Sequence, residues 1–233
     1  MDAVFIPPDG GLIYKESNFH QLFPEPWNMI SSALFLIPAV YWLVKLGGFS
    51  RQYTFLSIIT WLLLTGCVGS TVYHGLRRWH FFIFMDWVPI ALICLMASVY
   101  FWIKFTGRWV FGVLALVAFV AIIFGIHSIF QYHDIQLMIS LNYTLMVLMI
   151  VLPLFLLLWK MQWHNAWLVI LALISFSIAI FCRVDDKYTS WAIGTHFLWH
   201  TFGMIATSLM FVFIYKVNRD SRDLIDFQDM HII

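Results

Sequence analysis

Long runs of apolar residues, separated by short polar breaks, occupy most of the chain between residues 27 and 216. A helix needs about 20 apolar residues to cross the hydrocarbon core of a bilayer, because each residue adds about 1.5 Å. Runs close to that length predict seven transmembrane helices, over residues 27–47, 53–74, 81–103, 109–127, 135–159, 165–182 and 191–216. The pattern therefore predicts an all-α fold, a polytopic membrane protein built as a bundle of seven transmembrane helices.

The segments outside the spans divide the chain into three parts. Residues 1–24 contain several prolines and glycines and no continuous apolar core, which is typical of a short extramembrane arm and not of a secretory signal peptide. Residues 25–216 form the transmembrane domain, and residues 217–233 form a polar C-terminal tail. The chain leaves no room for a second domain.

The composition supports a lipid environment and excludes some partners. Of the 233 residues, 62% are hydrophobic and 11% are charged, whereas a soluble domain carries about 25% charged residues. The formal net charge of +1, without a large basic cluster, argues against a nucleic-acid partner. The three cysteines lie in apolar stretches at unrelated spacings, so we expect neither a disulfide framework nor a thiolate metal site.

The distribution of lysine and arginine predicts the orientation. An odd number of spans puts the two termini on opposite sides of the membrane. The side of the C-terminus carries eight basic residues, Lys45, Arg51, Lys104, Arg108, Lys160, Lys216, Arg219 and Arg222. The side of the N-terminus carries five, Lys15, Arg77, Arg78, Arg183 and Lys187. Because cytoplasmic loops are enriched in these residues, the excess predicts a cytoplasmic C-terminus.

The few polar side chains within the spans are expected at one membrane face. Ionisable groups inside a membrane are costly, so each is a candidate functional residue. The first, third and seventh spans start from the side of the N-terminus, and the second ends there. Within about two turns of that boundary lie Glu25, Asn28, Ser70, His74, Asp86, His196 and His200.

The spacing of the histidines points to a metal site. His196 and His200 are four residues apart, so they project from one face of one helix, and His74 adds a third nitrogen from a second helix. Three imidazoles with an open fourth position form a typical catalytic zinc site. Ser70 lies one turn before His74 and faces the same way, and Asp86 can act as a base or orient a water.

A structural interpretation of each residue stays open at this point. A single histidine in a membrane is more often a hydrogen-bonding partner between helices than a metal ligand. Asp86 could be a structural partner of Arg78 or Trp87.

Four motifs contain these residues in order along the chain: Glu25-Pro-Trp-Asn28-Met-Ile-Ser31-Ser32, Gly69-Ser70-Thr-Val-Tyr73-His74, Asp86-Trp-Val-Pro89-Ile90 and Gly194-Thr195-His196-Phe-Leu-Trp199-His200. In these motifs, which belong to a similarity from residue 13 to about residue 210, the sequence resembles the alkaline ceramidases, especially their bacterial relatives. That family belongs to a wider superfamily of seven-span hydrolases that also includes the adiponectin-type receptors. The resemblance implies seven helices around an intramembrane cavity open to lipid.

The resemblance also implies site residues. Zinc is expected on His74, His196 and His200, with Ser70 and Asp86 as catalytic partners. The expected reaction is hydrolysis of the N-acyl amide bond of ceramide or a similar lipid amide. In it, Asp86 takes the proton of the attacking water and passes it to the leaving amine, and Ser70 hydrogen-bonds the developing oxyanion.

A second metal site is implied by the N-terminal arm, which binds calcium in the animal ceramidases. The stretch from Ile13 to Asn18, followed by Glu25, is similar to that arm, so Glu16, Asn18 and Glu25 are candidate calcium ligands. The leading acidic residue of the family falls near Ile13 and is missing here, and the usual cysteine is Lys15. Without calcium, the two glutamates are expected to cap the first span or to pair with Arg77 or Arg78.

Arg183 with Asp185 or Asp186 also matches a pattern that relatives carry before the seventh span. The preferred interpretation is a loop ion pair that joins the sixth span to the seventh.

Two other functions stay open. The same zinc site would serve an ester hydrolase of phospholipids or lipid anchors. A receptor with a structural zinc is the third hypothesis, and it would gain if Asp86 were a fourth ligand, because structural zinc sites have four protein ligands.

Overall fold

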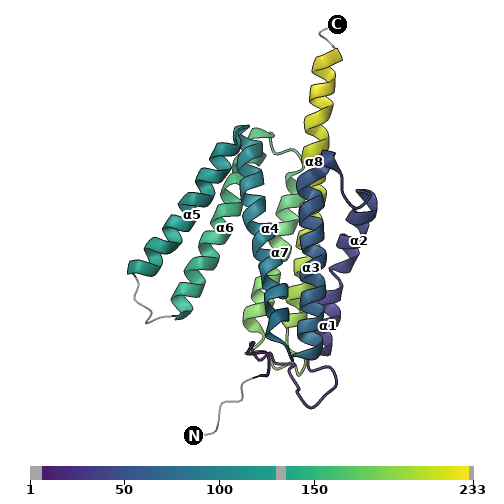
Figure 1. Cartoon of the computed structure of the whole chain (residues 1–233), viewed down its shortest axis with the longest axis vertical. Coiled ribbons are helices and arrows are strands. Elements are labelled where there is room, and N and C mark those ends of the chain that lie inside the picture. Colours follow the sequence, from purple (N-terminus) through teal and green to yellow (C-terminus); the bar gives the residue numbers. More distant parts are fainter. Residues whose placement is uncertain (1–6, 130–134, 231–233) are drawn as a thin grey trace. The chain divides into compact units, whose positions relative to one another are not determined.

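All regular elements in the described part of the chain are helices (Figure 1). The computed structural model describes residues 7–129 and 135–230, and the side chains of these residues except 127, 129, 135–144 and 220–230. The elements are α1 (Pro26–Ala33), α2 (Leu36–Lys45), the short 3₁₀ helix η1 (Arg51–Tyr53), α3 (Thr54–Leu76), α4 (His80–Thr106), α5 (Trp109–Ile129), α6 (Ile135–Lys160), α7 (Ala166–Asp185) and α8 (His196–Met230). The predicted all-α fold is confirmed.

Six stretches of the described residues are long and apolar enough to cross a membrane: Pro26–Lys45, Arg51–Leu76, His80–Thr106, Trp109–Ile126, Ala166–Asp185 and His196–Arg219. The part of α6 over Leu145–Lys160 adds a shorter apolar stretch. The chain is therefore a multi-span helical membrane protein by the length and composition of its helices. The limits of six of the seven predicted spans agree with these stretches to within a few residues, and the last begins at His196 instead of residue 191. The other prediction, 135–159, corresponds to the shorter stretch, and its residues 135–144 lie outside the described side chains.

The predicted first span, 27–47, is one apolar stretch but two helices. After α1 the backbone makes a tighter turn, in which the N–H of Leu34 donates to the carbonyl oxygen of Ser31 at 3.2 Å. Pro38 accounts for the break, because it has no N–H to bond the carbonyl of Leu34 and its ring crowds that carbonyl. As a result α1 is a separate short helix within the first apolar stretch.

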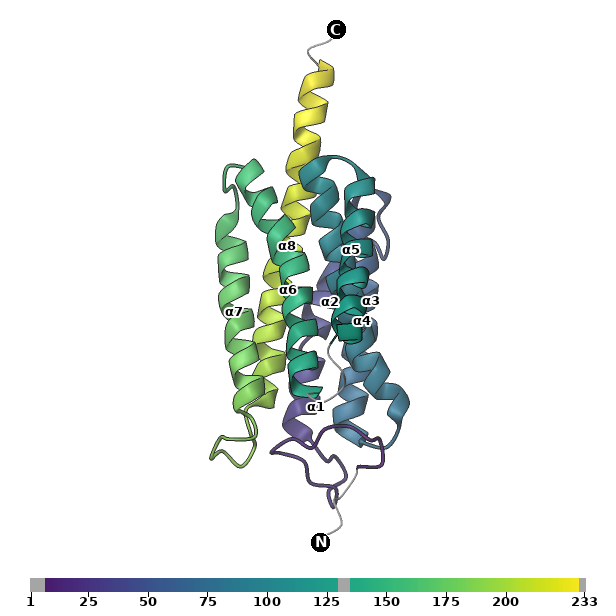
Figure 2. The same cartoon turned by 90° about the vertical axis from the view of Figure 1, so that its left-hand side faces the viewer.

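The described residues fall into two compact units, the first made of residues up to Ile90 together with those from Trp167 onward. In this unit α1 contacts α3 and α8, and α3 also contacts α2. Figures 1 and 2 show the N-terminal arm at the end where α1 and α8 begin and α3 ends, while α8 extends past α3 at the other end. The start of α1, the end of α3 and the start of α8, which carry predicted site residues, therefore lie together.

A glycine lets α3 and the first turns of α4 approach closely. A Cβ on Gly69 would lie 2.5 Å from the carbonyl carbon of Met85, so only a residue without a side chain fits there. Ser70 and Asp86 are the next residues of the two helices. The close approach thus brings the backbones of both candidate catalytic residues near one another.

The second unit, Ala91–Ala166, contains the rest of α4 together with α5 and α6. Ser98 of α4 donates to the carbonyl oxygen of Met149 of α6 at 2.6 Å. The Lys160 ammonium donates to the carbonyl oxygen of Phe105 at 2.6 Å and so satisfies an unpaired group at the end of α4. The described part of this unit contains none of the candidate site residues.

Candidate metal centre

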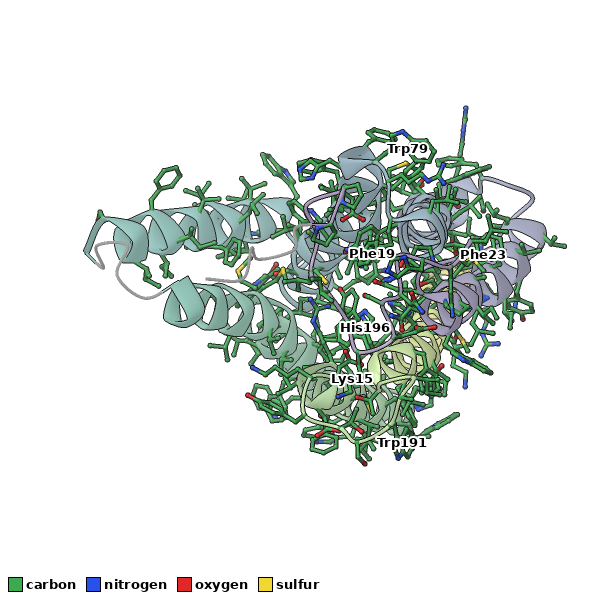
Figure 3. All side chains as sticks on the ribbon, turned by 90° about the horizontal axis from the view of Figure 1, so that it is seen from below. Lys15, Phe19, Phe23, Trp79, Trp191 and His196 are labelled. Atoms are coloured by element: carbon green, nitrogen blue, oxygen red, sulfur yellow. The ribbon has the colours of Figure 1, made fainter. Side chains whose placement is uncertain are left out.

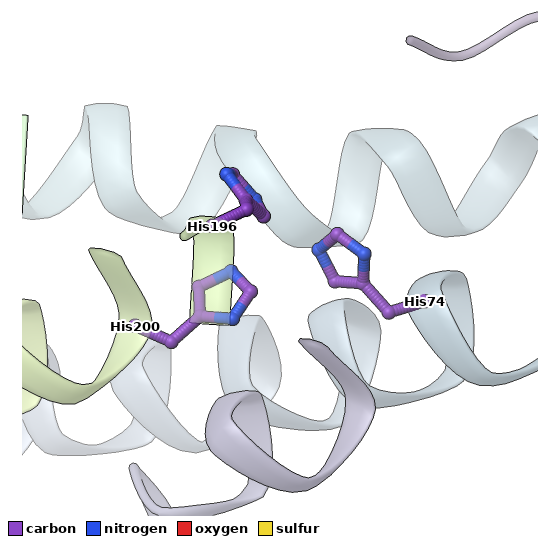
Figure 4. Close-up of side chains that lie close together, drawn as sticks. All are labelled: His74, His196 and His200. Atoms are coloured by element: carbon purple, nitrogen blue, oxygen red, sulfur yellow. The ribbon is translucent and has the colours of Figure 1, made fainter. Parts of the chain in front are cut away.

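Three histidines from two helices form one buried cluster (Figure 4). His74, His196 and His200 are 0%, 2% and 5% exposed. Each offers one nitrogen, and the three nitrogens lie within 4.8 Å of one another. This cluster, called the histidine cluster below, is the one group of at least three histidine, cysteine or acidic residues that can hold a metal ion among the described residues.

The ends of two helices position the cluster. His74 lies two residues before the end of α3, and His196 is the first residue of α8 with His200 one turn later. The ring centroids of His196 and His200 are 4.8 Å apart, and those of His74 and His200 are 4.9 Å apart. The predicted convergence of the three imidazoles is confirmed.

Unpaired nitrogens indicate that the cluster fits a metal ion. Nε2 of His74 and Nδ1 of His196 are buried and have no hydrogen-bond partner among the described residues. A buried polar atom without a partner is rare and needs an explanation, such as an ion. Three imidazole nitrogens at this separation suit a divalent cation such as zinc.

Glu25, the residue before α1, determines which nitrogen of His74 is free. Its Oε2 lies 2.5 Å from Nδ1 of His74, and both side chains are fully buried. A carboxylate only accepts hydrogen bonds, so Nδ1 carries a proton, and the neutral form of this imidazole has its lone pair on Nε2. A carboxylate behind a metal-binding histidine is the common way to orient such a ligand.

Two serines of α1 determine which nitrogen of His200 is free. The Oγ atoms of Ser31 and Ser32 lie 3.0 and 3.1 Å from Nδ1 of His200. Both hydroxyls donate to the carbonyl oxygen of Asn28, at 3.1 and 2.8 Å, so their protons are already used. Each serine oxygen can therefore accept a hydrogen bond from Nδ1–H of His200, which leaves its Nε2 with a lone pair.

Tyr14 of the N-terminal arm covers His196. The two rings are stacked, with centroids 3.9 Å apart and planes at 25°. In the view from below (Figure 3), Lys15 lies close to His196, so the arm passes beside the cluster. The sequence does not predict this contact, because no periodicity relates Tyr14 of an irregular arm to His196 of a helix.

Asp186 joins three segments at the start of α8. Its Oδ1 accepts the backbone N–H groups of Thr195 and His196, at 2.7 and 2.8 Å, and its Oδ2 accepts the N–H of Lys15 at 3.0 Å. A carboxylate at this place satisfies unpaired donors and interacts favourably with the helix dipole. It fixes the backbone of His196 and the arm together.

The predicted ion pair of Arg183 with Asp185 or Asp186 is wrong. Among the described residues Arg183 makes no ion pair, and its guanidinium lies 5.0 Å from the ring centroid of Trp199. The carboxylate of Asp186 instead accepts hydrogen bonds from backbone N–H groups, and the sequence pattern does not predict these bonds.

The hydroxyl of Ser32 lies between Ser70 and His200. Ser70 is buried, and its Oγ is 3.0 Å from Oγ of Ser32, which in turn is next to Nδ1 of His200. Its predicted catalytic role stays a prediction.

Asp86 is half-buried and makes no hydrogen bond or ion pair within the described part of the chain. The alternative of a structural partner in Arg78 or Trp87 is therefore wrong. Asp86 is also not a member of the histidine cluster, so it is no fourth ligand in this arrangement. Its predicted role as a base stays a prediction.

The candidate calcium ligands are bonded to the protein itself. The carboxylate of Glu16 accepts the N–H groups of Trp27 and Asn28 and thus caps α1. Burial raises the pKa of the Glu16 carboxyl above its ordinary value, although these two N–H groups act in the opposite direction. Oδ1 of Asn18 accepts the N–H of His20 at 3.1 Å. The predicted capping of the first span is confirmed, and the calcium site stays a prediction.

Arg77 pairs with Glu25, as the alternative without calcium predicted, and it also pairs with Asp9. All three side chains are buried from solvent. Burial would lower the pKa of the Arg77 guanidinium, but the hydrogen bond to Asp9 and the charge of Glu25 raise it above its ordinary value. Burial likewise would raise the pKa of the Asp9 carboxyl, which Arg77 holds below its ordinary value. The guanidinium is therefore a permanent charge at the end of α3.

A comparison of the chain with models of known protein families finds no match, and neither does a comparison with curated proteins. Fold and site therefore define the class by themselves. The chain is a multi-span helical membrane protein, with a buried cluster of three histidines that can bind a metal such as zinc.

Proposed function

We propose that the protein is a zinc-dependent intramembrane hydrolase that cleaves the amide bond of ceramide or a similar lipid amide, giving a sphingoid-type base and a fatty acid. The observation that carries the proposal is the set of three imidazoles at one end of a membrane bundle. Two of them have a buried nitrogen without a partner in the described part of the chain. An amide with two long chains is a substrate that a site inside the membrane domain can reach without leaving lipid.

The chain would hold zinc through His74, His196 and His200. A zinc ion on three imidazoles with an open fourth position polarises a carbonyl and lowers the pKa of water to about 7. Glu25 and the serine pair of α1 would keep two of the imidazoles in the tautomer that a metal needs. Three protein ligands favour this catalytic function over a receptor with a structural zinc, which normally has four.

Asp86 and Ser70 are the proposed catalytic residues. An acceptor without a hydrogen-bond partner is suited to take a proton, and the Asp86 carboxylate has none among the described residues. It would take the proton of the attacking water and pass it to the leaving amine. The Ser70 hydroxyl would hydrogen-bond the carbonyl oxygen as it gains charge.

The topology of the proposed enzyme has seven spans, with α6 as the span that the shorter apolar stretch Leu145–Lys160 represents. The excess of lysine and arginine places the C-terminus in the cytoplasm and the histidine cluster at the opposite face. An intramembrane cavity for the lipid is part of the proposal.

Calcium bound to Glu16, Asn18 and Glu25 is also part of the proposal, and a calcium titration of the purified protein tests it.

The decisive experiment is hydrolysis of a defined lipid by the pure protein. Wild type in detergent should release fatty acid from a ceramide, detected by mass spectrometry, and His200→Ala should not. His164→Ala is the matched control, because His164 is exposed and not part of the cluster. A phospholipid in a parallel reaction separates amide from ester hydrolysis. Zinc-loaded wild type that cleaves neither lipid refutes the proposal.

A further inference from the structure

Arg77 occupies a backbone position that arginine does not favour. It ends α3 in the left-handed region, with φ of +50°, and its N–H donates to the carbonyl oxygen of Tyr73 at 2.9 Å. Helices that end this way usually have glycine there, because a Cβ is disfavoured at positive φ. The presence of a long side chain at this position indicates that the side chain itself has a function.

The guanidinium of Arg77 bridges two buried carboxylates from different segments. Its Nε and Nη2 donate to the two oxygens of Asp9, at 2.6 and 3.1 Å, and its Nη1 donates to Oε1 of Glu25. The ring of Tyr73 lies 4.8 Å from the guanidinium carbon. A planar fork can hold two carboxylates in a fixed geometry, which an ammonium cannot do.

Glu25 connects Arg77 to the histidine cluster. One oxygen of its carboxylate accepts from Arg77, and the other lies 2.5 Å from Nδ1 of His74. Arg77 therefore orients the carboxylate together with Ser17, whose hydroxyl donates to the same oxygen, and the other oxygen orients His74. Because Nδ1 is held in this way, Nε2 of His74 is the nitrogen that stays unpaired in the cluster.

The charges of this network also favour a cation. Asp9, Glu25 and Arg77 are buried, and the two carboxylates and the guanidinium together carry one net negative charge. A divalent ion on the histidine cluster would find a compensating charge behind one of its ligands. Without Arg77 the same place would hold two buried carboxylates without the cation that pairs with both of them.

We infer that Arg77 is a positioning residue that clamps the N-terminal arm through Asp9 and orients His74 for metal through Glu25. The inference rests on the metal binding of the proposed function and not on its lipid chemistry.

The test uses full-length protein in detergent and compares substitutions of two adjacent arginines. Zinc affinity is measured by competition with a chelator for wild type, Arg77→Gln, Arg77→Gly and Arg77→Lys. Arg78→Gln is the matched control, because Arg78 is exposed and makes no hydrogen bond or ion pair with the other described residues. Substitution of groups behind a metal ligand commonly costs roughly 10–100-fold in metal affinity. We expect a loss in that range for Arg77→Gln and Arg77→Gly, a smaller loss for Arg77→Lys, and none for Arg78→Gln.

Arg77→Gly separates positioning from helix termination. Glycine suits the positive φ better than arginine, so a role in ending α3 alone predicts unchanged zinc affinity. Arg77→Lys is the control for unfolding, because it keeps a positive charge at this position. A second readout is trypsin cleavage after Lys15, an exposed residue of the arm, which should become faster in Arg77→Gln and stay slow in Arg78→Gln.

The outcomes separate this inference from the proposed function. Zinc affinity equal to wild type in Arg77→Gly and Arg77→Lys overturns the inference alone. Zinc binding by wild type without hydrolysis of any lipid overturns the proposed function and leaves the role of Arg77 intact. A wild type that binds no zinc overturns both.

Discussion

Tyr14 and His196 are 182 residues apart in the chain, yet their rings are stacked at a centroid distance of 3.9 Å. His196 begins α8, and Tyr14 belongs to an arm without regular structure. The arm therefore forms one wall of the histidine cluster. This contact leads to a prediction about how well the cluster is shielded.

Tyr14→Ala should expose His196, whereas Tyr14→Phe should not, because the stacking needs the ring and not the hydroxyl. Modification of histidines by diethylpyrocarbonate, followed by mass spectrometry, measures the exposure in protein without metal. His164, which is exposed, serves as the internal standard. We expect faster labelling of His196 in Tyr14→Ala and a rate like wild type in Tyr14→Phe. Equal rates in all three proteins would show that Tyr14 does not cover the ring.

The histidine cluster should bind one zinc ion per chain. His74→Ala, His196→Ala and His200→Ala should each lose most of it, because removal of one of three ligands leaves a site with only two. His164→Ala should keep the metal. Elemental analysis of the purified proteins after dialysis measures this. Full zinc content in His200→Ala would exclude the cluster as the binding site.

The convergence of the three histidines was predictable from the sequence for a physical reason. The spans are as long as the bilayer is thick, so alternation of direction decides which helix ends meet. Spacing of four residues then puts His196 and His200 on one face. These arguments need only local sequence and an even number of spans between α3 and α8, here α4 to α7.

The contacts of the arm were not predictable in the same way. Lys15 and Asp186 are 171 residues apart, and no periodicity connects an irregular arm to a loop. Arg77 and Arg78 are also indistinguishable in the sequence, although one is buried in an ion-pair network and the other is exposed. The break between α1 and α2 had a visible signal in Pro38, which the apolar pattern concealed. These features depend on which side chains meet in the folded structure, and local sequence does not determine that.

Ser31 and Ser32 should be redundant. Each has an oxygen that can accept the hydrogen bond of Nδ1–H of His200, at 3.0 and 3.1 Å. Ser31→Ala and Ser32→Ala should therefore change zinc affinity little when made singly. The double variant removes both hydroxyl acceptors of Nδ1–H and should weaken zinc binding by roughly 10-fold or more. Additive effects of the two single substitutions, measured by chelator competition, would contradict this redundancy.

The termini should lie on opposite sides of the membrane. A reporter fused after Ile233 should be cytoplasmic, because the basic residues of that side outnumber those of the other by eight to five. A reporter fused before Met1 should not be cytoplasmic. Reporter activity on the same side for both fusions would remove one span, and α6 would then be the helix to exclude first, because its described apolar stretch is the shortest.

Asp86 is the residue whose substitution best separates an enzyme from a structural metal site. The side chain is half-buried, and it lies outside the group of three metal-binding nitrogens. If it is a general base, Asp86→Asn keeps its size but cannot take the proton. Zinc should then stay bound while amide hydrolysis falls by roughly 10²–10⁴-fold, which is the usual contribution of a positioned acid or base.

Ser70→Ala is the companion of that substitution. The hydroxyl of Ser70 touches Ser32 and not an imidazole, so its loss should also leave zinc bound. If the hydroxyl stabilises the oxyanion, turnover should fall by roughly 10²–10³-fold, the range that loss of one such donor costs. Zinc content and hydrolysis rate are therefore measured side by side for both variants in one detergent preparation. Release of metal from Asp86→Asn would make Asp86 a ligand and favour a receptor with a structural zinc, whereas full activity in that variant would remove Asp86 from the mechanism.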